Sequence, residues 1–353
     1  DLHPVAHSLP HDALPIWIGA LIYLAIAYPE VGVPLLVVVV VVGAVKAKMN
    51  PNRTTRNAVK KLERIGGRAT GSLVDLEQRD PAFVEQEFLE RVEKIELAVQ
   101  DAWTRGDMSP VRTMLSDGLL RRFETQLSVM KAQGVRNAMA DHVVLEKQTH
   151  AVEHDSHFDT IHVAIRATAR DVEVDASLTL EQALEKAKKA RPEEYTEIWS
   201  FLRRPSAETL AKGGALEGRC PSCGAPVEVG QSTRCEHCEA LVNSGEHDWV
   251  LAEITQPIEW RPTSTGAVPG LDALGAADPA FNRQAAEDRA SYAFWRYVEA
   301  LVVAGARPLA KTATPELRAA VAARARGGPA PLYKTAVGSV DLLACERDRK
   351  SVV

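Results

Sequence analysis

The stretch DPAFVEQEFLERVEKIELAVQDAW, residues 80–103, decides the fold class. Its main apolar stripe recurs at intervals of three and four residues: Phe88, Val92, Ile95, Val99 and Trp103. This spacing predicts an amphipathic helix. Asp80-Pro81 suits the start of that helix, since Asp can cap it and Pro fits the first turn. Ser109-Pro110 shows the same pattern of a capping residue followed by proline, and a second amphipathic helix is expected up to Gly134.

Segments rich in β-forming residues follow these helices. Ile161, Val163 and Ile165 alternate with other residues, which is typical of a strand. Strands are expected at residues 141–148, 160–168, 194–203 and 248–256. Thr179 and Gln182 form a capping box for a short helix that ends near Lys189. Helices first and strands later predict an α+β domain, with the helices packed on one face of a curved antiparallel sheet.

Four cysteines carry the clearest chemical signal: Cys220, Cys223, Cys235 and Cys238 form two C-x₂-C turns. Two facing turns of this kind complete a tetrahedral site, and a closed shell of four sulfurs leaves no position for a substrate. The sequence therefore predicts one structural zinc ion in a zinc ribbon at residues 218–242, inserted in the hairpin loop before the last strand. Iron is an alternative by ligand type, and disulfides are disfavoured by the reducing compartment that we expect.

Residues 17–45 are apolar almost without interruption. As one helix these 29 residues would extend ~44 Å, beyond the ~30 Å hydrocarbon core of a bilayer. Pro29 and Pro34 interrupt the segment, which favours a transmembrane hairpin over a single kinked helix. Residues 46–74 form a basic linker, which places the following domains on the cytoplasmic side. This linker either binds anionic lipid or only determines the topology.

A second copy of the first helices is expected near the end of the chain. Asp278-Pro279-Ala280-Phe281 repeats Asp80-Pro81-Ala82-Phe83, an offset of 278 − 80 = 198 residues. The domains are therefore predicted at residues 75–260 and, truncated, at 276–347, with a linker at 261–275. Residues 1–16 and 348–353 resemble sequencing adapters after back-translation and are expected to be artefacts; an unusual disordered tail is the alternative.

These elements together resemble the Tim44-like domain, a family named after the subunit that anchors the mitochondrial import motor to the inner membrane. The similarity rests on dispersed residues: Asp80-Pro81, Phe88, Ala102-Trp103, Leu115-Ser116, Leu119, Phe158-Asp159, residues 197–203 and residues 249–254. The chain resembles bacterial members of this family, which combine a membrane anchor, a zinc ribbon and a second copy of the domain. The resemblance implies a cone-like fold similar to nuclear transport factor two, and binding of protein partners or lipid without catalysis.

The chain is thus expected to be a non-catalytic scaffold on the bacterial inner membrane that faces the cytoplasm and serves protein translocation or membrane-protein assembly. A net charge of −5 and 5% aromatic residues disfavour nucleic acid as a partner, and no small-molecule substrate is expected. An apolar ligand pocket is predicted from Val92, Ile95, Trp103, Val163, Ile165, Trp199 and Trp249.

The alternative is an enzyme that uses the pocket, with His162 and Asp159 as its acid and base. His150, His154, His157 and His162 are expected in a solvated turn, although they could also bind a metal.

Overall fold

The computed structural model describes residues 71–210, 214–227, 232–262, 268–278, 281–329 and 340–346, all within one unit of the chain, residues 58–353. The expected membrane segment 17–45, both adapter-like ends and most of the basic linker lie outside these ranges. Within them, no helix combines the length and the apolar character needed to cross a bilayer.

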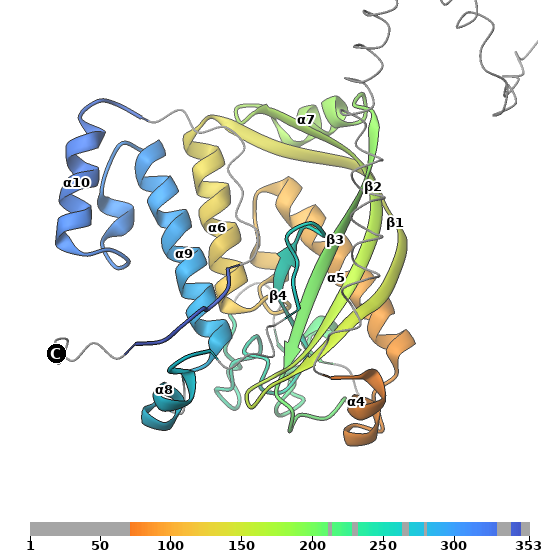
Figure 1. Ribbon diagram of the computed structural model, residues 1–353. Helices are drawn as coiled ribbons and strands as arrows, with labels where there is room; N and C mark the ends of the chain where they lie inside the picture. The colour runs from red at the N-terminus through yellow and green to blue at the C-terminus, as the bar shows by residue number, and fades with distance from the viewer. Residues whose placement is uncertain are drawn as a thin grey trace, which may run out of the picture. The chain divides into compact units, whose positions relative to one another are not determined.

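A four-stranded antiparallel sheet confirms the predicted α+β class (Figure 1). Its strands are adjacent in chain order: β1 (Val135–His154), β2 (Asp159–Asp175), β3 (Pro192–Arg203) and β4 (Val250–Thr255). The first two strands are much longer than expected, because a tight turn joins them. In this turn the Asp155 carboxylate accepts hydrogen bonds from the backbone N–H groups of His157 and Phe158, at 2.6 and 2.8 Å.

The helices are α4 (Leu73–Arg79), α5 (Glu85–Arg105), the 3₁₀ turn η2 (Ser109–Val111), α6 (Asp117–Ala132) and α7 (Leu180–Ala187). The two long helices, α5 and α6, begin at other residues than predicted. Asp80 does not cap α5, because its carboxylate binds Arg203 and Thr209 instead. Ser109-Pro110 starts only the 3₁₀ turn, and Ser116 caps α6. The capping box of Thr179 and Gln182 is confirmed at the start of α7.

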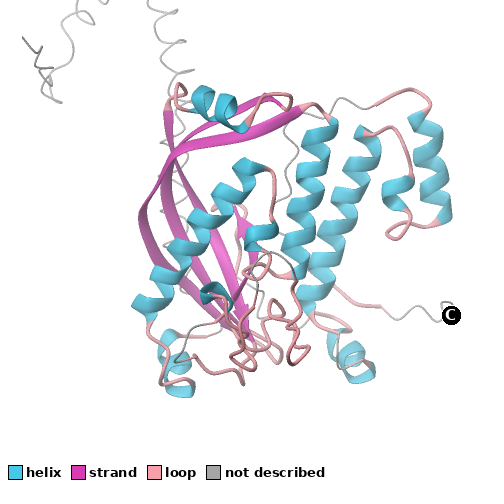
Figure 2. Ribbon diagram, turned by 180° about the vertical axis from the view of Figure 1, so that it is seen from behind, coloured by secondary structure: helices cyan, strands magenta, loops and turns pink. Residues whose placement is uncertain are grey.

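The core lies between the sheet and helices α5 and α6, around which the sheet curves (Figure 2). Odd-numbered residues of β2 and β3, such as Ile161, Val163 and Trp199, pack against Val92 and Ile95 of α5 and their neighbours. Even-numbered residues point to the other face of the sheet, because successive side chains of a strand alternate. We call these two surfaces the helix-facing side and the outer side.

Buried and half-buried ion pairs join the helices to the ends of the strands. Arg203 Nη1 lies 2.9 Å from Asp80 Oδ2, and both side chains are buried. The Arg203 guanidinium also lies 4.5 Å from the centre of the Trp249 ring. Two bidentate ion pairs also join helices to strands. Arg79 of α4 pairs with Asp159 at the start of β2, and Arg91 of α5 pairs with Asp248 just before β4. Several residues that carry the family resemblance thus meet in space.

A C-terminal module, residues 268–329 with 340–346, follows the sheet. Its elements are α8 (Leu271–Ala277), α9 (Arg283–Val302), η4 (Arg307–Leu309) and α10 (Pro315–Ala325). Each starts 198 residues after α4, α5, η2 and α6, respectively: 271 − 73, 283 − 85, 307 − 109 and 315 − 117. The helix N-cap is repeated too. The Thr314 side chain accepts a hydrogen bond from the Leu317 N–H, as the Ser116 side chain does from the Leu119 N–H. The same order of elements therefore occurs twice.

Candidate functional site

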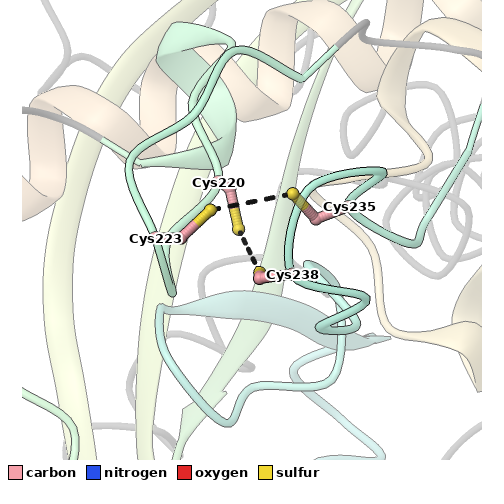
Figure 3. A group of neighbouring side chains, drawn as sticks. All are labelled: Cys220, Cys223, Cys235 and Cys238. Carbon is pink, nitrogen blue, oxygen red and sulfur yellow. Dashed lines mark hydrogen bonds between the residues drawn. The ribbon is translucent and has the colours of Figure 1, made fainter.

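The four cysteines lie together in the connection between β3 and β4 (Figure 3). The Sγ atoms of Cys220 and Cys238 are 3.7 Å apart, and those of Cys223 and Cys235 are 3.8 Å apart. All four Sγ atoms lie within 4.8 Å of one another. The two C-x₂-C turns therefore face each other, as the spacing predicts.

Both turns have the same backbone structure. The Gly224 N–H donates to the Cys220 carbonyl at 2.8 Å, and the Glu239 N–H donates to the Cys235 carbonyl at 2.9 Å. Gly224 has a φ of 74°, as expected for glycine, whereas Glu239 adopts a φ of 61° despite its side chain. Two matching turns hold four sulfurs at fixed positions, which is what a metal site requires.

Two of the sulfur–sulfur separations suit a tetrahedral metal site. A tetrahedron with metal–sulfur bonds of ~2.3 Å has sulfur–sulfur edges of ~3.8 Å, close to the separations of 3.7 and 3.8 Å in these two pairs. Burial raises the pKa of the Cys220 thiol to about 12, so this sulfur becomes a thiolate only beside a cation. The described residues contain no other group of three or more Cys, His, Asp or Glu side chains placed to bind a metal ion. The four cysteines can thus bind one metal ion.

A second candidate site is a cleft of about 560 Å³ between α5, α6 and the helix-facing side of the sheet. Its apolar lining is Val99, Trp103, Phe123, Met130, Met139 and Ile254. Six carboxylates also line it: Asp171, Glu173, Glu193, Glu194, Glu197 and Glu259. Arg122 is the single basic residue of the lining. We call this the acidic cleft.

Polar groups lie at the floor of the acidic cleft. Burial raises the pKa of Glu197, although its carboxylate accepts hydrogen bonds from Trp199 Nε1 and Gln256 Nε2, at 3.0 and 3.3 Å. The Tyr195 hydroxyl lies 2.8 Å from His142 Nε2, and burial strongly raises the tyrosine pKa. His142 Nε2 also lies 2.9 Å from the buried Glu96 carboxylate. A cation that entered the cleft would meet the Glu197 carboxylate, which burial makes costly to ionise alone.

A neighbouring cleft of about 540 Å³ adjoins the acidic cleft. Trp103, Met130 and Asn137 line both, and Trp103 Nε1 donates to Asn137 Oδ1 at 3.1 Å. The hydrogen-bonded pair therefore stands between the two clefts. Residues of α6 line both clefts.

The predicted pocket residues fall into two groups. Trp103 lines both clefts. The other six are buried in the packed core: Val92, Ile95, Val163, Ile165, Trp199 and Trp249. Tyr195 and Glu197 were not predicted from the sequence, although strand alternation places both on the same side of β3 as Trp199. A carboxylate on the apolar side of a strand was the available signal.

The histidines of the β1–β2 hairpin do not form one solvated turn. His162 is buried on the outer side of the sheet, where its Nδ1 lies 2.8 Å from Ser200 Oγ and its ring meets Trp260. His150 also packs against the Trp260 ring. Asp159 is paired with Arg79 and His154, each at 2.7 Å. Neither His162 nor Asp159 lines the acidic cleft, so the expected acid and base do not meet there.

The order of helices and strands, with a cleft between them, agrees with the family comparison. Residues 69–211 match the model of the Tim44-like domain. This Tim44-like domain spans α4 to β3 and ends before the cysteines. Comparisons with curated proteins and with solved structures gave no match. The Tim44-like domain favours a non-catalytic binding scaffold. The match covers neither the cysteine loop nor the C-terminal module.

Proposed function

We propose that this chain is a non-catalytic scaffold whose Tim44-like domain binds a segment of another protein in the acidic cleft. The cleft has room for several side chains and combines aromatic and aliphatic surface with six carboxylates. This charge favours a ligand with an apolar body and positive charges, and it repels the phosphate of an anionic lipid. A basic amphipathic segment fits both properties.

The setting that we propose is the cytoplasmic side of the bacterial inner membrane. It is supported by the apolar segment 17–45 and by the basic residues that follow it. A tethered scaffold that binds basic amphipathic segments suits protein translocation or membrane-protein assembly. The cysteine cluster is proposed to hold one structural zinc ion in a ribbon, and the repeated elements support a second Tim44-like copy after residue 268.

Binding of a designed peptide tests the ligand class. A Lys/Leu helical peptide is titrated onto the protein beside a matched Glu/Leu peptide and vesicles of anionic lipid. We expect the basic peptide to bind and to weaken with salt, and Glu197→Gln to raise its Kd about tenfold, or ~1.4 kcal/mol. Glu181→Gln, on the exposed side of α7, should leave the Kd unchanged. Preferential binding of the acidic peptide, or of vesicles, would refute the proposed ligand.

A second candidate is catalysis in the same cleft. The convergence of Tyr195, His142 and Glu96 favours it, since a chain of polar groups that leads from a pocket into the interior can move a proton. The tyrosine would act as a hydrogen-bond donor, because burial raises its pKa. His142 and Glu96 are almost fully covered, however, and neither lines the cleft. Tyr195→Phe separates the two functions: it should leave peptide binding intact and abolish any turnover.

A further inference from the structure

Helix α6 has a second packed side, on which α9 of the C-terminal module lies (Figures 1 and 2). Trp295, Val298 and Val302 of α9 form an apolar cluster with Val129 of α6. Near the start of α6, the Asp288 side chain of α9 comes so close to Gly118 that a Cβ atom there would lie 2.2 Å from its carboxyl group. The interface is therefore closely fitted at this point, and a side chain at position 118 would displace Asp288.

Carboxylates from separate elements converge at this end of the interface. Glu253 of β4, Asp288 of α9 and Arg122 of α6 line a cavity of about 20 Å³, room for roughly one water molecule. The charged groups that face this cluster are Asp117, Arg122, Glu197, Glu253, Glu259, Arg283, Glu287, Asp288 and Asp341. Acidic groups outnumber the basic ones, and Arg283 already pairs with Glu287 and Asp341.

We infer that docking of the C-terminal module on α6 and β4 is coupled to the uptake of a proton by the Glu253–Asp288 pair. The two carboxylates belong to different parts of the chain, so the module brings them together only when it docks. Arg122 is the basic group on the Tim44-like side of this cavity, and one guanidinium cannot neutralise both carboxylates. A proton bound by either carboxyl group removes the excess charge where little water can screen it.

The sign of the pH dependence follows from the two states. Burial raises the pKa of Glu253 to about 7 and that of Asp288 to about 6. When the module is undocked, Glu253 on β4 and Asp288 on α9 would both face water, with ordinary pKa values near 4. A carboxyl group with a higher pKa in the docked state binds its proton more tightly there. Docking is therefore favoured below pH 6 and weakens as the pH rises through 7, about tenfold between pH 6 and pH 8 for one such proton.

The same contact reaches the acidic cleft through one residue. Arg122 lines both the small cavity and the cleft, so its guanidinium faces carboxylates on two sides. When the module undocks, Glu253 loses the neighbouring carboxylates Asp288 and Glu287 and ionises. Its negative charge then partly neutralises Arg122. The state of the module thus changes the potential of the cleft. The docking itself requires no ligand, so its test is independent of the proposed peptide binding.

Hydrogen exchange measured by mass spectrometry on the full chain tests this coupling. After correction for intrinsic rates, we expect amides 283–302 of α9 to be about tenfold more protected at pH 6 than at pH 8, with β2 as internal reference. Glu253→Gln and Asp288→Asn, singly and together, should remove most of this difference. Glu316→Gln, an exposed carboxyl group of α10, should keep it.

Two results would overturn the inference. One is equal protection of α9 at both pH values in the parent chain. The other is the full pH difference in a folded Glu253→Gln variant, with folding judged by unchanged protection of β2. Glu253→Gln is nearly isosteric and lies outside the module, so it distinguishes loss of the titrating group from misfolding of α9.

Discussion

The Asp80 carboxylate joins the end of α4 to β3 and to the chain that leads into the cysteine loop. It accepts hydrogen bonds from Thr209 N and Thr209 Oγ1, at 3.0 and 2.6 Å, and pairs with Arg203 at 2.9 Å. Asp80→Ala would leave the buried Arg203 guanidinium without its counter-charge. Removing one partner of a buried ion pair costs ~3–5 kcal/mol. The Trp249 ring still faces the guanidinium, so we expect the lower end, about 3 kcal/mol.

Urea unfolding followed by circular dichroism measures this loss. Glu77→Ala, at an exposed site of the same helix, should change the free energy of unfolding by less than ~0.5 kcal/mol. The double variant Asp80→Ala/Arg203→Met should recover most of the loss, because it removes both charges. A loss below ~1 kcal/mol for Asp80→Ala, or a double variant as unstable as the single one, would refute the buried-pair account.

The pH dependence gives an independent check of the same pair. Burial raises the pKa of Asp80, but hydrogen bonds from Thr209 and Arg203 outweigh it, so the net pKa lies below its ordinary value. A carboxyl group with a depressed pKa contributes stability above its unfolded value near 4, and this stability is lost as the pH falls through the folded value. The difference between parent and Asp80→Ala should therefore shrink below pH 4.

Three further predictions concern the metal, the core and the membrane. Cys220→Ser should lower bound zinc from one equivalent to nearly none and expose residues 214–242 to protease while the sheet persists; iron in the parent would contradict the zinc assignment. Val163→Phe, at a position with 0% exposure, should cost ~1–3 kcal/mol in urea unfolding, and Val143→Phe, 50% exposed, should cost little. The full chain should resist high-salt and alkaline extraction from membranes, whereas a chain that begins at Asp75 should be soluble; release of both would disprove the anchor.

Local patterns made much of this protein predictable from its sequence. The spacing of Phe88, Val92 and Ile95 predicted a helix that the structure contains, and alternation predicted β2 and β3. The capping box at Thr179 and the two C-x₂-C turns were equally readable. Each of these signals depends on residues within a few positions of one another, where backbone geometry alone determines which side chains can meet. The offset of 198 residues was also visible in the sequence, and the elements α8 to α10 follow it; a second Tim44-like domain stays a prediction.

Contacts between residues that are far apart in the sequence were determined only by the tertiary structure. Asp80 is a good cap by type, yet a partner 123 residues away, Arg203, takes its carboxylate (203 − 80 = 123). Six of the seven apolar residues expected to line a pocket lie in the core, because side chains of the helices and the sheet pack closely against one another there. The acidic cleft and the small cavity lined by Glu253 and Asp288 unite residues from α6, the sheet and α9. Their charges act over distance in a low-dielectric interior, so only the folded arrangement determines which carboxylates share one space.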